Sequence, residues 1–259
     1  MKIIVCAKQV PDPEAPYTAV QVNSDTKEIS TKGVAPVINP YDENALEAAL
    51  RIKDENGAEV VVISVGSKIS QAVLRRSLAV GADNLVVVDS PQFKSLDSSS
   101  IAYVLSKALE KMGEYDLILT GRQAGDWDLG QTGLILGEIL GIPTVNLVRS
   151  VKIEDGKVVA EKILPGAYEL VKSNLPALLT VSSEVGELRY PIAKRKIQAY
   201  KQPIDVWSAE DIGVDSDKLV QIDMSALMPP PDMGRDCQFI EGDSPEEKGK
   251  NLASILKGG

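Results

Sequence analysis

Four short apolar runs stand out in the first half of the chain. Each run is bounded by polar residues, and its apolar positions are continuous rather than alternating. This pattern is typical of strands in a parallel sheet that is covered on both faces. The sequence therefore predicts buried strands at residues 3–7, 59–66, 84–89 and 116–120.

Helical patterns separate these runs. Apolar residues recur at helical spacing around residues 46–50, 73–78 and 101–112. A helix start is predicted at Asn39-Pro40, because asparagine is suited to capping and proline fits the first helical position. Alternating strands and helices predict an α/β fold with a parallel sheet and helices on both of its faces.

The pattern changes after Pro143, where the apolar segments become short and alternating. We expect antiparallel strands at residues 148–153, 157–163, 168–171 and 177–181, extending the same sheet. A similar alternation of apolar and polar residues at about 20–33 predicts a surface hairpin. The sequence thus predicts an α/β domain over residues 1–204, with a hairpin insertion at about 20–33 and an antiparallel β extension at about 146–182.

Periodicity fades from about residue 208 onward. Near the end, Ser244 is followed by Pro245 and Glu247, which form a capping box with proline at the first helical position. The helix that follows carries Leu252, Ile255 and Leu256 at helical spacing. We interpret residues 205–259 as a C-terminal arm whose small amphipathic helix lies either on its own domain or on a partner subunit.

Composition excludes several classes of function. The formal net charge of −9 disfavours nucleic acid and anionic membranes as partners, and no segment is expected to insert into a membrane. The chain has no histidine, which excludes a Ser-His-Asp triad and a histidine-ligated zinc site. We predict no catalytic residue and no metal site. Cys6 and Cys237 lie far apart and suit a reducing, cytoplasmic location.

The segment from Gly121 to Gly133 is the strongest candidate for a binding site. It follows a predicted strand and precedes an apolar helical stretch. A glycine-rich turn into a helix presents backbone N–H groups backed by the positive end of the helix dipole, so phosphate is the expected ligand. The loop matches neither a phosphate-binding loop of NTP hydrolases nor a nicotinamide fingerprint. It should lie with the other strand ends at one crevice of the sheet.

Several segments, in order along the chain, resemble the beta subunit of electron-transfer flavoproteins. They are residues 5–12, 38–49, 78–83, 121–133 and 175–180, within a similarity that runs from Met1 to about Ile204. The resemblance implies a Rossmann-like domain that pairs with an FAD-carrying alpha subunit. It implies electron transfer between a dehydrogenase, of the acyl-CoA type in many members, and a second redox partner. It also implies an AMP, or a second FAD in electron-bifurcating members, within this subunit.

The resemblance also implies which residues line the nucleotide site. They are Cys6, Asn39, Val65, Asp126, Gly130, Gln131 and Thr132. Gly133 and Trp127 belong to the same loop, and Trp127 stands where related loops carry a small or acidic residue. Its ring either stacks on a flavin or adenine or fills a hydrophobic gap. Tyr41 is expected near the dimethylbenzene edge of the alpha-subunit FAD.

Residues 183–190 match the loop with which family members dock on acyl-CoA dehydrogenases. The implied docking residues are Val185, Glu187, Arg189 and Tyr190, with Val185 at the position of an anchoring leucine. The chain departs from the family pattern here, since Gly186 replaces a polar residue and Leu188 replaces a proline. Two interpretations of residues 183–190 therefore remain open. The segment is either a docking loop or a solvated connection with one half-buried valine.

Alternative functions follow from the same residues. The first keeps the family and makes the chain an electron-bifurcating subunit whose own FAD oxidises NADH. A second, of another class, is a stand-alone adenine-nucleotide sensor of the universal-stress type, which shares this sheet architecture. An ATP-using ligase is disfavoured because the phosphate loop lacks the expected lysine and serine or threonine.

Overall fold

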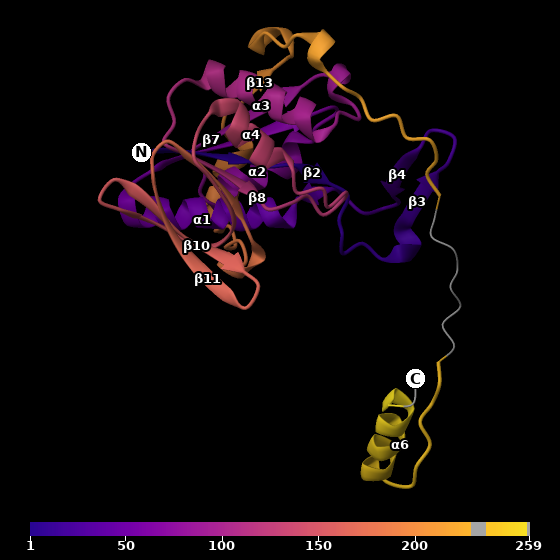
Figure 1. The fold of residues 1–259 in the computed structure, drawn as a ribbon. Coiled ribbons are helices and arrows are strands. Elements are labelled where there is room, and N and C mark those ends of the chain that lie inside the picture. Colours follow the sequence, from indigo (N-terminus) through magenta and orange to yellow (C-terminus); the bar gives the residue numbers. More distant parts are fainter. Residues whose placement is uncertain (229–236, 258–259) are drawn as a thin grey trace.

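The computed structural model describes residues 1–228 and 237–257. Within these ranges one large sheet contains β1 (Lys2–Cys6), β6 (Glu59–Gly66), β7 (Asn84–Asp89), β8 (Leu117–Gly121), β9 (Thr144–Glu154), β10 (Lys157–Leu164), β11 (Ala167–Asn174), β12 (Ala177–Val181) and β13 (Asp205–Trp207). Their order is β11-β10-β9-β12-β8-β1-β6-β7-β13 (Figure 1). The four strands predicted from continuous apolar runs are confirmed as the adjacent parallel strands β8, β1, β6 and β7.

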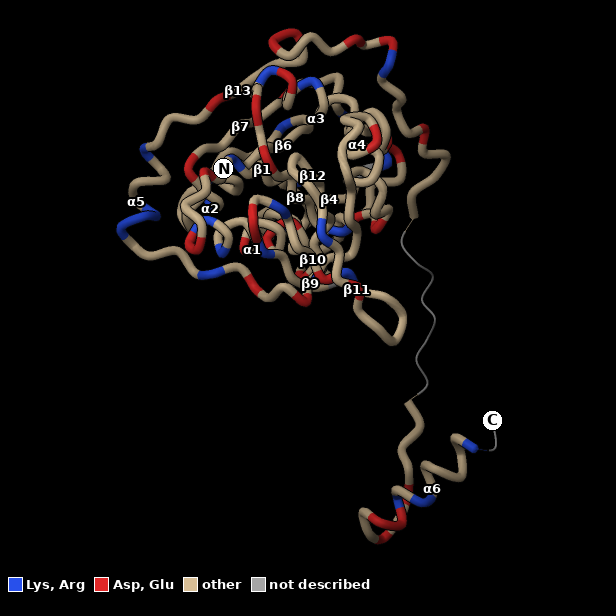
Figure 2. Tube along the Cα trace, turned by 60° about the vertical axis from the view of Figure 1, so that its left-hand side comes forward, with Lys and Arg blue, Asp and Glu red and all other residues tan. Residues whose placement is uncertain are grey.

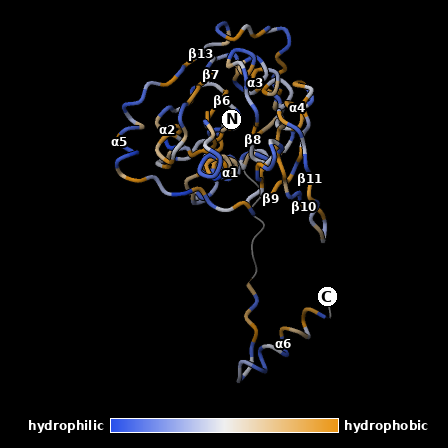
Figure 3. The backbone as a smooth tube through the Cα atoms, turned by 90° about the vertical axis from the view of Figure 1, so that its left-hand side faces the viewer, coloured by the Kyte–Doolittle hydropathy of each residue, from blue (hydrophilic) through white to orange (hydrophobic). Residues whose placement is uncertain are grey.

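Helices cover both faces of this sheet, as predicted. One face packs against α1 (Pro40–Asn56), α2 (Gln71–Val80) and α5 (Ala193–Lys201), and the other against α3 (Ser98–Met112) and α4 (Thr132–Leu140). Strand residues alternate between the two cores: Ile3 and Val5 of β1 join the first, and Ile4 and Cys6 join the second. Figure 3, coloured by hydropathy, shows hydrophobic residues within the domain and mostly hydrophilic residues along the outer helix α5.

The strand at residues 177–181 differs from its prediction. β9 with β10 and β10 with β11 are antiparallel, as expected, but β12 lies between β8 and β9 and is parallel to both. All five residues of β12 are buried, so its apolar run is that of a central strand rather than an exposed extension. The chain thus builds the outer strands β9, β10 and β11 of the sheet and then returns to its interior with β12.

The sheet continues past residue 204. β13 pairs in parallel with β7, and Ala209 and Ile212 are buried against the α3 face. Farther along, the N–H of Asp97 donates to the carbonyl oxygen of Val220 at 3.0 Å. The stretch that opens the predicted arm, from Asp205 to about residue 222, therefore packs on the α/β domain.

The hairpin and the terminal helix form as expected. β3 (Val20–Asn23) pairs with β4 (Glu28–Thr31), and β2 (Gln9–Val10) pairs with β5 (Val37–Ile38). α6 (Pro245–Lys257) starts with the N–H of Glu247 donating to Ser244 Oγ at 3.2 Å. Figure 1 shows α6 apart from the α/β domain, and Leu256 is 73 % exposed.

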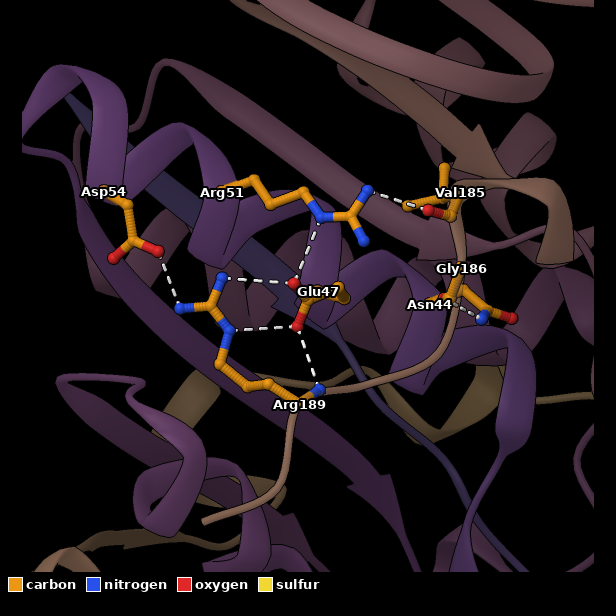
Figure 4. A network of polar contacts seen from close by, with 7 residues as sticks. All are labelled: Asn44, Glu47, Arg51, Asp54, Val185, Gly186 and Arg189. Carbon is orange, nitrogen blue, oxygen red and sulfur yellow. Dashed lines mark hydrogen bonds and ion pairs between the residues drawn. The ribbon is translucent and has the colours of Figure 1, made fainter. Parts of the chain in front are cut away.

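A buried carboxylate fixes the segment after β12 to the middle of α1 (Figure 4). Glu47, 5 % exposed, accepts hydrogen bonds from the backbone N, Nε and Nη2 of Arg189 and from Nε of Arg51, at 3.0–3.1 Å. Arg51 also donates to the carbonyl of Val185 at 2.8 Å, and Asn44 donates to that of Gly186 at 2.6 Å. Helix α1 therefore determines the path of residues 185–189.

Replacing Glu47 with Gln should lower the free energy of unfolding by about 1–3 kcal/mol, because the variant loses the charge-assisted bonds to two guanidinium groups. Burial raises the pKa of Glu47, but the hydrogen bonds and charge of Arg189 outweigh it and hold the pKa below its usual value. The stability that the carboxylate contributes should accordingly persist at neutral pH and be lost as the pH falls below about 4.

Urea unfolding of both proteins at pH 7 and pH 3.5 measures this effect. Glu55→Gln on the exposed side of the same helix is the matched control and should change stability by less than about 0.5 kcal/mol. Equal unfolding free energies for Glu47→Gln and the wild type at pH 7 would contradict the structural role of Glu47.

Candidate nucleotide-binding site

A cleft of about 930 Å³ lies at the carboxyl ends of the parallel strands. Its walls come from residues that end or follow β1, β6, β7 and β8, from the start of α1, from Thr26 and Lys27 between β3 and β4, and from the later segment 221–224. The nine residues predicted to bind a cofactor all line it: Cys6, Asn39, Val65, Asp126, Trp127, Gly130, Gln131, Thr132 and Gly133. The fold thus brings together positions that are spread over more than 120 residues of sequence.

The N-terminus of α1 shapes one wall of the cleft. The sequence predicts that the Asn39 side chain caps this helix, but the side chain makes no capping hydrogen bond. Instead its Nδ2 donates to the carbonyl of Gln123 at 2.8 Å, and its Oδ1 accepts from the N–H of Gly125 at 3.0 Å. An amide that both donates and accepts can fix a loop at two points. Asn39 therefore holds the first half of the glycine loop.

Asp42 forms a second link, one helical turn later. Its Oδ2 accepts from the N–H of Lys8 at 2.7 Å, and its Oδ1 accepts from the N–H of Gly121 at 2.9 Å. A Cβ at Gly121 would lie 2.7 Å from Tyr41 and 2.5 Å from Asp42 Oδ1. Only glycine allows this close approach. Asp42 thus joins the loops after β1 and β8 beneath the cleft.

The second half of the loop leads into α4. Gln131 precedes this helix, and Thr132 and Gly133 are its first residues. A Cβ at Gly133 would lie 2.6 Å from Thr120 Oγ1, so the helix start approaches β8 closely. The first N–H groups of a helix lack carbonyl partners within it and favour an anion. This wall of the cleft can hold a phosphate by backbone donors.

Charged and aromatic side chains border the opening. Lys8 Nζ and Asp126 Oδ2 form an ion pair at 2.6 Å. The guanidinium of Arg122 lies 5.0 Å from the centre of the Tyr41 ring, a cation–π contact. Trp127 is 51 % exposed at the cleft wall, so its ring does not fill a buried gap. The ring is available to a ligand.

Burial perturbs two acidic groups at this site. It raises the pKa of Asp42 to about 7, although the hydrogen bonds from Lys8, Asn39 and Gly121 and the charge of Lys8 act in the opposite direction. Burial, together with the nearby Asp42 carboxylate, raises the pKa of the Cys6 thiol. The thiol is therefore protonated at neutral pH and is unsuited to nucleophilic chemistry.

Sequence reasoning missed several residues of the cleft. Lys8, Asp42, Ser64, Thr120 and Arg122 line the cleft but were not selected individually from the sequence. Lys8 and Arg122 lie within two residues of predicted strand ends, which was an available signal. No local pattern points to residues 221–224, because they reach the cleft from a distant part of the chain.

The predicted docking residues do not form one exposed surface. Val185 is 8 % exposed within the core, so its side chain is not available as a surface anchor. Arg189 is occupied by Glu47 and by Asp54, whose Oδ2 lies 2.6 Å from its Nη1. Glu187 is exposed, and Tyr190 is 87 % exposed. Valine is buried here because the turn at residues 183–185 brings it onto α1.

Comparison with known proteins identifies the family. The family model described as "Electron transfer flavoprotein domain" matches residues 26–212. The chain belongs to the electron-transfer flavoprotein family. It is 40 % identical over 215 residues to "Caffeyl-CoA reductase-Etf complex subunit CarD" of Acetobacterium woodii, covering 83 % of this chain and 80 % of that protein. It is also 40 % identical over 220 residues to "Electron transfer flavoprotein subunit beta" of Thermoanaerobacterium thermosaccharolyticum, covering 85 % and 83 %.

A third relative extends over nearly the whole chain. "Protein FixA" of Azotobacter vinelandii is 30 % identical over 268 residues, covering 99 % of this chain and 94 % of that protein. The resemblance to beta subunits of this family is thereby confirmed, and the membership supports a role in electron transfer. The family membership gives no support to the alternative of a stand-alone stress-type sensor.

Two further features of the described residues bear on the class of protein. No helix among them combines the length and the apolar character that crossing a bilayer requires. Within the same ranges, no group of three or more Cys, Asp or Glu side chains is arranged to hold a metal ion.

Replacing Asp42 with Asn should remove a pH-dependent part of the stability. Because the folded-state pKa of Asp42 is raised to about 7, the folded protein binds a proton more tightly than the unfolded chain does. The contribution of Asp42 is therefore greatest below about pH 4 and is lost as the pH rises towards 7, at up to about 1.4 kcal/mol per pH unit.

Urea unfolding at pH 5, 6, 7 and 8 compares the two proteins. The stability of the wild type relative to Asp42→Asn should fall as the pH rises and then level off above pH 7. Asp25→Asn, on the exposed hairpin, is the control and should show no such slope. Parallel stability curves for Asp42→Asn and the wild type would show that burial does not control this carboxyl group.

Proposed function

We propose that the chain is the beta-type subunit of a heterodimeric electron-transfer flavoprotein. In this proposal it binds an adenine nucleotide in the cleft, helps to position the FAD of an alpha subunit and carries out no chemistry alone. Electrons then pass from a dehydrogenase to a second redox partner. A cytoplasmic location is part of the proposal, because two free cysteines, one of them exposed, suit a reducing compartment.

The convergence of the predicted nucleotide residues on one cleft carries this proposal. The cleft volume of about 930 Å³ lies within the usual range for ligand sites. The proposed phosphate position is the start of α4, where Gln131, Thr132 and Gly133 offer backbone N–H groups. Backbone donors can hold an anion even though the protein as a whole is acidic.

Two polar atoms in the cleft wall suit a nucleotide. Ser64 Oγ and Arg122 Nε are buried and have no hydrogen-bond partner among the residues that the structure describes. Buried donors without partners are rare in folded proteins. A ligand with a polar base, a sugar and phosphate oxygens offers partners to both. AMP and FAD each carry these groups, and both therefore belong to the proposal.

The alpha-subunit FAD is proposed to lie against Tyr41. This ring precedes Asp42 on the first turn of α1, next to the cleft wall, and carries the guanidinium of Arg122 on one face. An aromatic ring excludes water from a flavin edge, and a fixed positive charge stabilises an electron-rich flavin. Tyr41 and Arg122 would thus connect the nucleotide cleft with the cofactor of the partner.

Docking of the dehydrogenase is proposed for the surface that runs from Glu187 and Tyr190 into α5. Ile192, Ile197 and Tyr200 are each more than 60 % exposed on this surface. Figure 2 shows Lys and Arg along α5, which contains Lys194, Arg195 and Lys196. Apolar contacts ringed by charges suit complexes that form and separate rapidly. An acyl-CoA dehydrogenase is the proposed partner.

The C-terminal helix is proposed to bind the alpha subunit. Leu252, Ile255 and Leu256 of α6 are 44 %, 46 % and 73 % exposed and lie at helical spacing. Apolar residues on one side of a solvated helix indicate an interface. With this assignment, α6 is an arm of this chain that lies on the alpha subunit.

Mass spectrometry of the nucleotides released from the co-expressed heterodimer tests the proposal. One FAD and one AMP per heterodimer indicate a simple electron carrier, and two FAD indicate an electron-bifurcating subunit. Either result supports an adenine nucleotide in this chain. Release of the alpha-subunit FAD alone, from a complex purified without dialysis, would contradict the proposal.

Replacing Leu252, Ile255 and Leu256 together with Ser tests the arm. The affinity for the alpha subunit should fall on the order of a thousandfold or more, because each of the three buried side chains contributes about 1.5–3 kcal/mol. The unfolding of the α/β domain should not change. Lys248→Ser with Lys250→Ser on the same helix is the control, and analytical ultracentrifugation measures the dissociation constant. Unchanged affinity of the triple variant would exclude α6 from the interface.

A further inference from the structure

Ser64 has an unusual position in the wall of the cleft. It lies near the carboxyl end of β6, between Ile63 and Val65, which also line the cleft. Its residue exposure is 1 %, and its hydroxyl group has no hydrogen-bond partner within residues 1–228 and 237–257. A hydroxyl that is withdrawn from water without a partner destabilises the fold.

Other buried serines of the domain differ from Ser64. Ser77 Oγ donates to the carbonyl of Leu74 at 2.7 Å, and Ser106 Oγ donates to that of Tyr103 at 2.7 Å. Ser100 Oγ accepts from the N–H of Val220 at 2.7 Å. The fold therefore provides partners for these buried hydroxyl groups, whereas the unpaired hydroxyl of Ser64 lies in the wall of the cleft that is proposed to hold the ligand.

The sheet order determines which end of a nucleotide lies near Ser64. The proposed phosphate position follows β8, and β6 lies two strands away, across β1. Two strand spacings amount to about 10 Å. The cleft is lined by residues at the ends of β1, β6, β7 and β8, so a nucleotide anchored after β8 extends towards β6. Its base then lies on the side of Ser64.

We propose that the Ser64 hydroxyl hydrogen-bonds the adenine base of the bound nucleotide. The inference rests on the proposed function and adds a residue that recognises the base. Adenine presents a ring-nitrogen acceptor and an amino donor, and a serine hydroxyl can pair with either. The backbone donors after β8 hold the phosphate, whereas Ser64 distinguishes an adenine nucleotide from a bare sugar phosphate.

Isothermal titration of the full chain, freed of nucleotide, tests the inference with AMP and FAD as probes. Ser64→Ala should weaken the binding of each nucleotide that the wild type binds by about 3- to 10-fold, as expected for one neutral hydrogen bond. The melting temperature of the nucleotide-free variant should equal or exceed that of the wild type, because the variant no longer buries an unpaired hydroxyl. Ser77→Ala removes a buried hydroxyl outside the cleft and should bind like the wild type.

Ribose 5-phosphate provides the second comparison, because it lacks the base. The wild type and Ser64→Ala should bind it equally. Equal nucleotide affinities for wild type and Ser64→Ala, or a lower melting temperature of the nucleotide-free variant, would overturn the role of Ser64 while leaving the proposed function intact. A similar loss for ribose 5-phosphate would overturn the assignment to the base. A wild type that binds neither AMP nor FAD would overturn the proposed function and this inference together.

Discussion

The cleft depends on the contact between the first turn of α1 and the backbone of the glycine loop. Asn39 and Asp42 together bind four backbone groups, those of Lys8, Gly121, Gln123 and Gly125. These groups belong to residues that end or follow β1 and β8, two neighbouring parallel strands. This contact, together with the Lys8–Asp126 ion pair, fixes the path of the glycine loop between β8 and α4. The positions of the phosphate donors follow from it.

The same helix connects the cleft with the segment that follows β12. Its first turn contacts the glycine loop, and Glu47, farther along, holds Arg189 and the segment before α5. Both contacts rely on carboxylates in nearly dry surroundings, where hydrogen bonds to charged groups are strong. The two environments differ, however. Arg189 offsets the burial of Glu47, whereas the burial of Asp42 outweighs its neutral hydrogen-bond donors and the charge of Lys8, so the pKa of Asp42 rises.

Much of this architecture could be predicted from local pattern. The continuous apolar runs at β1, β6, β7 and β8 and the glycine loop before α4 are properties of short segments, and their convergence at one edge follows from parallel topology. The placement of β12 could not be predicted, because an edge strand and a returning central strand of five residues look alike in sequence. Val185 was misjudged for a related reason. Its burial depends on α1, which is more than 120 residues away. Asn39 could not be distinguished from an ordinary helix cap, since its partners lie 84 and 86 residues farther along.

A crystal structure of the full chain with its alpha subunit, grown in the presence of AMP, tests the central claim most directly. We predict nucleotide density in the cleft, with phosphate oxygens within hydrogen-bonding distance of the backbone nitrogens of Gln131 and Thr132 and with Asn39 and Asp42 still bound to the glycine loop. A heterodimer in which the cleft holds neither AMP nor FAD, or in which Trp127 closes it, would contradict the account.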